Sequence, residues 1–347
     1  FSSNFGTAFE ASTGRQSTLN ITSVPSGPSV AGPQGEVLRY VWNSAGRWLA
    51  QWNSSKVFST QSSGNINAGT MARYDWNISI SGLGSGSWAI NTGPAYTSLD
   101  TYNVGVAYDN IILLRQGSLG ELGNWNGANI TAISLKPECR GQILWTKHYP
   151  AAPGNVTRAV VGWDTKNGVF ITQDKETMVL NGFSLSNGNK LWGPTEPAGD
   201  YSFFRQSTMV AYDKVYYAGY GGVLYCYDVL TGERLWTYGN DPSNPRNSTY
   251  AGMATAWGHY PIFIDVISDG KIYLATTEHS PNSPYYKDVR YRCVNATTGE
   301  QIWTLMGWGT GMDAAHDVIA DGFFVFLNCY DMQIYCVGKG PSAITVE

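Results

Sequence analysis

A short stretch that ends in tryptophan recurs along this chain, and it constrains the fold more than any other feature. The stretch LYCYDVLTGERLW (224–236) is matched by RCVNATTGEQIW (292–303), with the same spacing from cysteine to glycine. FSLSNGNKLW (183–192) and ISLKPECRGQILW (133–145) carry the same turn and the same tryptophan. The copies recur at intervals of about 45 residues, with one longer interval, and such a period is typical of repeat folds.

A second half-motif precedes each copy. DVISDGKIYLAT (265–276) and DVIADGFFVFLN (317–328) are near duplicates, and VAYDKVYYAG (210–219) and VAYDNIILL (106–114) are close variants. Each is an apolar run, a turn at aspartate and an alternating strand. One full unit is therefore four antiparallel strands, which predicts a β-propeller blade. No segment keeps a 3.6-residue period for more than two turns, so a helical solenoid is excluded.

The repeats predict one all-β domain, a β-propeller, over residues 1–347. It would hold a partial blade at 1–22 and six recognisable blades, at 28–80, 101–149, 157–193, 203–238, 261–305 and 314–346. Either strands from elsewhere in the chain complete the partial blade, or the chain is a fragment of a longer protein. The second explanation is favoured because the last unit is complete, and the intact ring would then have seven or eight blades.

The composition agrees with this fold and argues against two kinds of partner, nucleic acid and the membrane interior. Only 14% of residues are charged, whereas 14% are aromatic and 40 are glycine, a balance that suits tight turns between strands. The net charge of −4 leaves no basic footprint, so we expect no nucleic-acid partner. No apolar run approaches the ~20 residues that cross a bilayer, so we expect no membrane span.

The strand, turn and tryptophan of LYCYDVLTGERLW and RCVNATTGEQIW resemble the pyrroloquinoline-quinone-like β-propeller repeat. That repeat occurs in quinoprotein dehydrogenases, in a bacterial outer-membrane assembly lipoprotein and in archaeal and bacterial surface proteins. The resemblance covers nearly the whole chain and implies the fold, but a fold alone does not carry a function. The Ser/Asn-rich insertions and the ending QIYCVGKGPSAITVE (333–347) are most similar to archaeal extracellular members.

Two sets of repeated residues are interpreted as structural. A tryptophan near the end of the fourth strand would fill the wedge between successive blades, with its N–H on a neighbouring carbonyl. These residues are Trp76, Trp145, Trp192, Trp236 and Trp303. Cys226, Cys293 and Cys336 share one position of the third strand and are expected to be buried free thiols. Alternatively, Cys329 and Cys336 pair across the hairpin that they flank.

Catalytic chemistry finds little support in the residues. The resemblance implies that a dehydrogenase would hold a quinone and Ca²⁺ on the propeller axis. Asp265 and Asp317 stand at matching places in first strands and would suit a hard cation, although capping of the adjacent Asp-Gly turn is equally economical. There is no GxSxG elbow, HExxH pair or P-loop. We therefore predict no catalytic residue and no cofactor, with Ca²⁺ or pyrroloquinoline quinone as the alternative.

A binding function has more support in the sequence than catalysis does. The long connections between strands would leave the blades on one face, where they form a rim rich in aromatic residues. Aromatic plates with polar neighbours suit a sugar ring. Contact with a protein partner or a second copy, and packing of the loops on one another, are the alternatives. The predicted rim residues are Trp125, Trp257, His259, Tyr285, Tyr286, Trp308 and Asp313.

Seven Asn-X-Ser/Thr sequons occur, which is more than the composition explains, although accidental sequons are the alternative. Together with the low charge they predict a secreted, glycosylated protein. The sequon asparagines are Asn20, Asn53, Asn77, Asn129, Asn155, Asn247 and Asn295.

We therefore expect a non-catalytic extracellular β-propeller that acts as a scaffold or interaction module at a cell surface. Its partner would be another protein or a copy of itself in an extracellular assembly. The alternatives are a quinone- or Ca²⁺-dependent sugar or alcohol dehydrogenase and a glycan-binding propeller.

Overall fold

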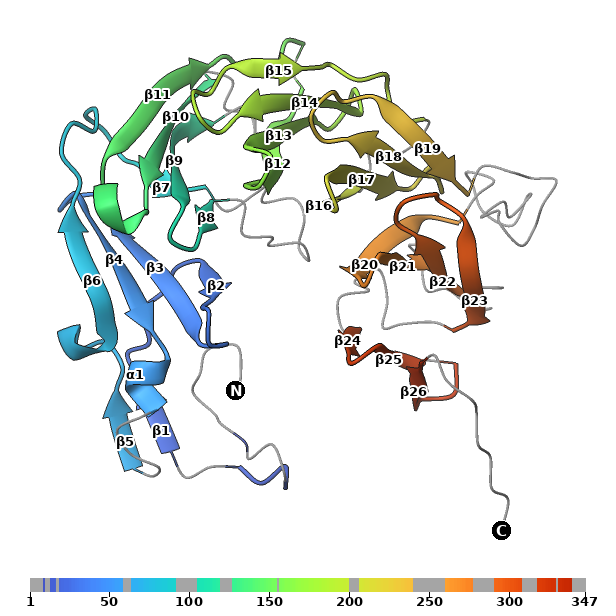
Figure 1. Ribbon diagram of the computed structural model, residues 1–347, viewed down its shortest axis with the longest axis horizontal. Coiled ribbons are helices and arrows are strands. Elements are labelled where there is room, and N and C mark those ends of the chain that lie inside the picture. The colour runs from blue at the N-terminus through green and yellow to red at the C-terminus, as the bar shows by residue number, and fades with distance from the viewer. Residues whose placement is uncertain are drawn as a thin grey trace. The chain divides into compact units, whose positions relative to one another are not determined.

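The structure is a computed structural model, and its regular elements are almost all β-strands (Figure 1). It describes residues 9, 13–16, 19–58, 64–91, 105–118, 127–154, 156–199, 206–239, 260–276, 290–307, 317–328 and 330–338. The chain divides into two compact units. The first is Phe1–Gly93, Tyr102–Ala152 and Ser186–Gly188, and the second is Pro94–Thr101, Pro153–Leu185 and Asn189–Glu347.

The first unit contains two antiparallel sheets. One pairs β2 (Ser29–Ala31), β3 (Val37–Asn43), β4 (Trp48–Asn53) and β6 (Tyr74–Ser79) in that order. The other runs β11 (Ile143–Tyr149), β10 (Gly127–Ser134) and β9 (Ile111–Ser118), and β9 also pairs with both β7 (Ala89–Ile90) and β8 (Val106–Ala107). A short 3₁₀ turn, η3 (Pro137–Cys139), links β10 to β11. The sheet expected over 101–149 therefore also takes in the earlier strand β7.

The N-terminal segment pairs in a way that the repeat did not predict. Strand β1 (Leu19–Thr22) lies parallel to β5 (Gly64–Asn67), which belongs to the Ser/Gly/Asn-rich insertion of the first blade. The same insertion forms α1 (Ser55–Phe58) and η1 (Met71–Arg73). Ile21 and Ile66 are buried in one cluster with Trp52 and Val57, so hydrophobic burial holds this small sheet against β4 and α1.

The second unit contains four antiparallel sheets with the same strand order. The first sheet pairs β12 (Arg158–Asp164), β13 (Val169–Asp174), β14 (Val179–Ser184) and β15 (Lys190–Trp192), and the second pairs β16 (Gln206–Ala211), β17 (Lys214–Gly219), β18 (Leu224–Asp228) and β19 (Arg234–Tyr238). The third sheet pairs β20 (Ile262–Ser268), β21 (Lys271–Thr276), β22 (Arg290–Asn295) and β23 (Gln301–Met306). The fourth pairs β24 (Val318–Ala320), β25 (Phe323–Asn328) and β26 (Gln333–Val337). The last of these sheets has three strands in the described part of the chain.

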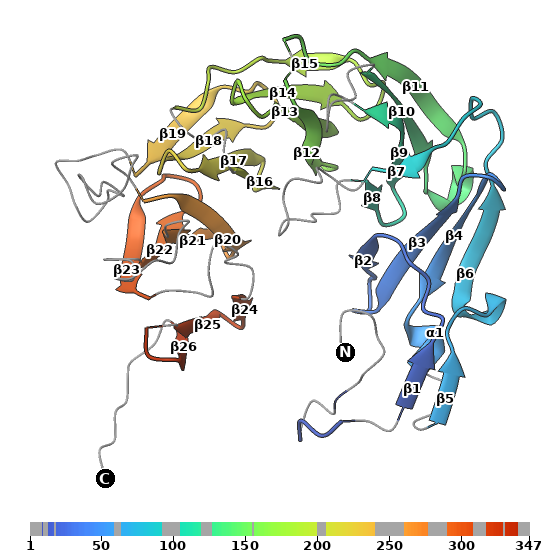
Figure 2. The same cartoon turned by 180° about the vertical axis from the view of Figure 1, so that it is seen from behind.

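First strands lie together in this unit. β12 contacts β16, β16 contacts β20, and β20 contacts β24, so the sheets fan outward from their first strands (Figures 1 and 2). This arrangement of four-stranded antiparallel sheets is that of propeller blades. The predicted fold class, an all-β propeller, is confirmed.

The turn between first and second strands has a common chemistry. Asp109, Asp213, Asp269 and Asp321 occupy it with φ between 42° and 60°. Aspartate tolerates this left-handed conformation better than most residues with a side chain. The repeated aspartate of the sequence motif is therefore explained by backbone geometry.

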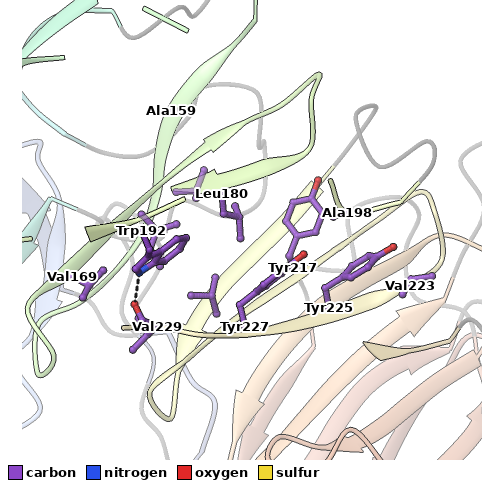
Figure 3. Close-up of a cluster of buried hydrophobic side chains, with 13 residues drawn as sticks. Ala159, Val169, Leu180, Trp192, Ala198, Tyr217, Val223, Tyr225, Tyr227 and Val229 are labelled. Atoms are coloured by element: carbon purple, nitrogen blue, oxygen red, sulfur yellow. Dashed lines mark hydrogen bonds between the residues drawn. The ribbon is translucent and has the colours of Figure 1, made fainter. Parts of the chain in front are cut away.

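Neighbouring sheets of the second unit meet through an indole (Figure 3). The ring of Trp192 lies on the turn of the next sheet, where a Cβ on Gly232 would come within 2.5 Å of its Cε3. Trp236 lies in the same way on Gly299, where the corresponding distance is 2.6 Å. A glycine at each turn is what admits the indole.

The remaining three tryptophans pack against aromatic rings, a glycine or a guanidinium group. Trp303 contacts the rings of Tyr273 and Phe324, and its neighbours are buried. In the first unit, Trp145 lies on Gly188. Trp76 packs edge-on to Tyr40, and the Arg140 guanidinium lies over the Trp76 ring, 4.9 Å from its centroid. All five indoles therefore occupy comparable places in their sheets.

Candidate functional site

The seven predicted rim residues, Trp125, Trp257, His259, Tyr285, Tyr286, Trp308 and Asp313, all lie outside the described residues. The structure does describe the strand ends from which those connections leave, such as the end of β19 at Tyr238 and the start of β22 at Arg290. The aromatic rim therefore stays a prediction.

A polar triad of the buried Tyr238 and Arg292 and the half-buried Gln301 lies close to two of these strand ends. Tyr238 Oη donates a hydrogen bond to Gln301 Oε1 at 2.6 Å, and Arg292 Nη1 donates to both Tyr238 Oη and Gln301 Oε1, each at 3.1 Å. Burial raises the pKa of Tyr238, and the neighbouring Arg292 opposes that shift. The triad ties the end of β19 to the next sheet. Sequence reasoning missed it because Tyr238 lies more than 50 residues before Arg292 and Gln301, and neither of these two residues is repeated at the matching place of LYCYDVLTGERLW.

Two further polar contacts involve the end of β13, which meets the start of β12 and the start of β16. The hydroxyl of Thr208 donates to Gln173 Oε1 at 2.7 Å and thereby joins β16 to β13 of the preceding sheet. Arg158 binds Asp174 through two hydrogen bonds, at 2.5 and 2.6 Å. Such bidentate pairs hold their geometry well. The ends of the strands near the predicted rim are therefore rigidly connected.

The two carboxylates considered for a metal lie on neighbouring first strands. Asp265 occupies a β-bulge in β20, where the register with β21 shifts between Ile264 and Val266, and both of its carboxylate oxygens are buried. Asp317 immediately precedes β24, and its Oδ2 is buried. A bulge re-aims the side chain that it carries.

On their own, Asp265 and Asp317 supply fewer oxygen ligands than a Ca²⁺ ion takes. Ca²⁺ takes about six to eight oxygen ligands. Within the described ranges, no three His, Cys, Asp or Glu side chains gather in a way that could hold a metal. A Ca²⁺ or quinone site therefore stays a prediction.

The sequon asparagines differ in exposure. Asn77 on β6 and Asn20 on β1 are exposed, and Asn20 Nδ2 donates to Asn65 Oδ1 at 3.0 Å. Asn53, at the end of β4, is only 9% exposed, and its Nδ2 donates to Asp75 Oδ2 at 3.0 Å. The sequons of the first blade thus present one accessible and one enclosed amide.

The other sequons are either engaged or outside the described residues. Asn129 Nδ2 donates to Gln116 Oε1 at 3.1 Å, and Asn295 Oδ1 accepts from the backbone N–H of Thr297 at 2.8 Å. Asn155 and Asn247 fall in parts of the chain that the structure does not describe.

The cysteines of the repeated position divide into two kinds. Cys226 and Cys293 are buried free thiols, and burial raises the pKa of Cys226 to about 12 and that of Cys293 to about 11. Cys336 is also a free thiol but is exposed, so its predicted burial is wrong. The reason is local, because β26 pairs only with β25 among the described strands. Cys329 lies outside the described residues.

Exposed apolar side chains occur along the last sheet, β24–β25–β26, and in the turn between β25 and β26. We call this set the end-sheet patch. Its members and their exposed fractions are Val318 (59%), Phe323 (49%), Tyr330 (40%), Met332 (68%) and Ile334 (75%). Large apolar groups left in water in one place mark an interaction surface. The end-sheet patch is the candidate functional surface of the described chain.

The repeat itself shows how unusual this exposure is. Ile334 stands two residues before Cys336, as Leu224 stands before Cys226 and Tyr291 before Cys293. Leu224 is 0% exposed and Tyr291 is 1% exposed. The position is thus a core position in the two preceding sheets and an exposed one in the last sheet.

As for membrane insertion, none of the helices in the described ranges combines the length and apolarity that a transmembrane span requires.

Two solved structures are similar to this chain. The crystal structure of BamB from Moraxella catarrhalis is 15% identical, with a TM-score of 0.40, and the match covers 73% of this chain and 62% of that one. The crystal structure of the computationally designed Ika4 protein is 14% identical, with a TM-score of 0.32, and the match covers 62% of this chain and 95% of that one. The chain thus spans less than two thirds of the BamB structure. None of the curated proteins matches it.

A family model gives the stronger result. The model described as outer membrane protein assembly factor BamB matches residues 138–339, which is more than half of the chain. The matched region includes four of the five tryptophans near the ends of fourth strands, and it includes both buried cysteines, Cys226 and Cys293. The chain therefore belongs to the family of the outer membrane protein assembly factor BamB.

Proposed function

We propose that this chain is a non-catalytic extracellular scaffold that holds a protein partner, and that the partner binds at the end-sheet patch. The family description names an assembly factor, which supports a role in protein contacts. The sequons and the low charge support an extracellular location. The hydrogen bonds between strand ends, such as those of Arg292 with Tyr238 and of Thr208 with Gln173, support a rigid binding surface.

The observation that carries the proposal is the exposure of Ile334. At 75% it contrasts with 0% for Leu224 and 1% for Tyr291 at the same position of the repeat. Covering a large aliphatic side chain contributes on the order of 2 kcal/mol. A partner that buries Ile334 with Met332 and Phe323 would therefore gain appreciable affinity at this place.

The free edge of β26 indicates what kind of segment binds there. In the two preceding sheets a fourth strand pairs with the third, so that Trp236 lies opposite Cys226 and Trp303 lies opposite Cys293. β26 pairs only with β25 in the described part of the chain. The partner segment would be an extended strand that adds to β26 by main-chain hydrogen bonds and places an aromatic side chain opposite Cys336.

A peptide copied from this chain tests the proposal. The sequence of residues 300–306, EQIWTLM, is a fourth strand with its tryptophan. Labelled with a fluorophore, it should bind the full chain, as measured by fluorescence polarisation. The same peptide with alanine in place of tryptophan should bind at least about tenfold more weakly, because the indole supplies most of the apolar contact.

Matched variants of the chain locate the binding. Ile334→Asp should weaken binding of the EQIWTLM peptide by about tenfold or more, since it places a charge in the contact. Leu230→Asp changes another exposed aliphatic residue, 52% exposed, at a turn of another sheet and should leave binding unchanged. Equal binding by the two variants, or no binding by the unaltered chain, would refute the proposal.

The dehydrogenase and glycan-binding alternatives rest on the rim and on Asp265 and Asp317. No observation in the described residues favours either of them.

A further inference from the structure

We infer that Asn77 is an N-glycosylation site of this protein and that the neighbouring sequon at Asn53 stays unmodified in the folded chain. The two sequons lie on paired strands of one sheet, Asn53 on β4 and Asn77 on β6. The inference rests on the extracellular location in the proposed function, and it does not depend on the end-sheet patch.

Asn77 is placed where a glycan fits. It lies on β6, the fourth strand of its sheet, which pairs only with β4 among the described strands. Asn77 and the sequon hydroxyl residue Ser79 are both exposed, and they alternate with the partly buried Trp76 and Ile78. Among residues that follow the tryptophan as Asn77 follows Trp76, Thr146 is also exposed, whereas Thr237 and Thr304 are half-buried.

Asn53 is placed where a glycan does not fit. Its side chain is 9% exposed, and Nδ2 donates to Asp75 Oδ2 at 3.0 Å. Its Oδ1 accepts two hydrogen bonds from Ser55, from the backbone N–H at 2.9 Å and from the hydroxyl at 2.7 Å. A sugar on Nδ2 would break the contact with Asp75 and would force a hydrated group into a buried place. A chain modified at Asn53 would therefore not reach this structure.

The modification is a group transfer from a lipid-linked oligosaccharide donor of the secretory pathway. The Asn77 amide nitrogen attacks the anomeric carbon of the donor. A C–N bond forms as the C–O bond to the carrier phosphate breaks. The phosphate leaves with the electron pair, and the amide gives up one proton to a base of the transferase. No oxidant or reductant is needed.

A glycan at Asn77 would also protect the strand that carries it. An outer strand leaves main-chain groups that other strands can pair with, and proteins cover such edges to avoid association. A bulky, hydrated group on the exposed face of β6 would keep a second copy away from that edge.

Peptide mapping tests the assignment directly. The full chain is secreted from a host that glycosylates Asn-X-Ser/Thr sequons and is digested with trypsin. Cleavage after Arg47, Lys56, Arg73 and Arg115 gives peptides 48–56 and 74–115, each with one sequon. Enzymatic release of the glycan converts a modified asparagine to aspartate. We expect this mass change in peptide 74–115 and not in peptide 48–56.

Two variants make the test decisive. Asn77→Gln should remove the mass of one glycan from the intact protein, and Asn53→Gln should leave the glycan mass unchanged. Ser79→Ala removes the sequon but keeps Asn77, so it gives the same answer if Asn77→Gln does not fold. An unmodified peptide 74–115, or a glycan on peptide 48–56 of the folded protein, would overturn the inference. Failure of the EQIWTLM peptide to bind β26 would refute the scaffold and leave this result intact.

Discussion

The indole N–H of Trp192 donates a hydrogen bond to the main-chain oxygen of Val229 at 2.9 Å and so links β15 to the turn after β18 in the next sheet (Figure 3). The following junction is built differently. There the equivalent acceptor, Ala296 O, receives the hydroxyl of Tyr216 at 2.8 Å. The buried Nε1 of Trp236 has no hydrogen-bond partner in the described part of the chain. Two junctions with the same packing therefore differ in one polar contact.

This difference predicts unequal costs for the same substitution. Trp192→Phe and Trp236→Phe remove similar apolar area, but only Trp192→Phe also loses a hydrogen bond. We expect Trp192→Phe to lower the free energy of unfolding by about 1 kcal/mol more than Trp236→Phe. Urea unfolding of the two variants measures the difference. Equal losses, or a larger loss for Trp236→Phe, would contradict the role given to the Val229 contact.

The glycine turns can be tested with a matched pair. Gly232 (φ +71°) and Gly270 (φ +67°) have the same backbone conformation, but a Cβ on Gly232 would meet Trp192 at 2.5 Å, whereas a Cβ on Gly270 would meet nothing within 4 Å. Gly270→Ala should cost about 1 kcal/mol, which is the cost of the left-handed conformation. Gly232→Ala should cost about 1–3 kcal/mol more, because the indole must move. Thermal unfolding of both variants checks this order, and a smaller loss for Gly232→Ala would argue against the junction.

The thiols should differ in reactivity. Burial raises the pKa of Cys226 to about 12 and encloses both Cys226 and Cys293, whereas Cys336 is exposed. Since the thiolate is the reactive form, Cys336 should be alkylated first in the folded protein at pH 8, with Cys226 and Cys293 modified only after unfolding. Mass spectrometry of iodoacetamide-treated protein gives the order. Early modification of Cys226 would contradict its burial.

Stability should fall in alkaline solution. The native state keeps the Cys226 proton up to about pH 12, while the unfolded chain releases it near its ordinary pKa of 9.0. Between these values the unfolded state binds fewer protons, so the free energy of unfolding decreases as pH rises, by at most about 1.4 kcal/mol per pH unit for one thiol. Cys226→Ala should make this decrease shallower, as measured by urea midpoints from pH 8 to 11. A slope that is the same with and without Cys226 would contradict the burial of this thiol.

The repeat predicted the sheets well because each uses local signals. The Asp turn, the glycine turn and the tryptophan lie within one unit, and their spacing is visible in a single stretch such as 210–236. The pairing of β1 with β5 was not predictable in this way, because two short Asn-Ile segments, Asn20-Ile21 and Asn65-Ile66, meet in parallel across a long interval. The burial of Ile21 and Ile66 in one cluster with Trp52 and the hydrogen bond from Asn20 to Asn65 both favour that pairing.

The candidate site shows the same limit. The position of Cys336 in its strand was predicted, yet its exposure was not, because burial depends on which strand and which sheet lie next to it. Arg292 and Gln301 lie in one copy of the repeat and Tyr238 follows another, and only folding brings the three within hydrogen-bond distance. The rim residues from Trp125 to Asp313 remain an expectation drawn from the repeat.

The indole–glycine contacts between neighbouring sheets of the second unit limit how such chains can gain or lose repeats in evolution. Trp192 and Trp236 each come from one repeat, and the glycines that receive them, Gly232 and Gly299, come from the next. Duplication or loss of one whole repeat would regenerate a complete indole–glycine contact at the new boundary, whereas an insertion of half a repeat would not. Relatives of this protein should therefore gain or lose sequence in whole-blade steps.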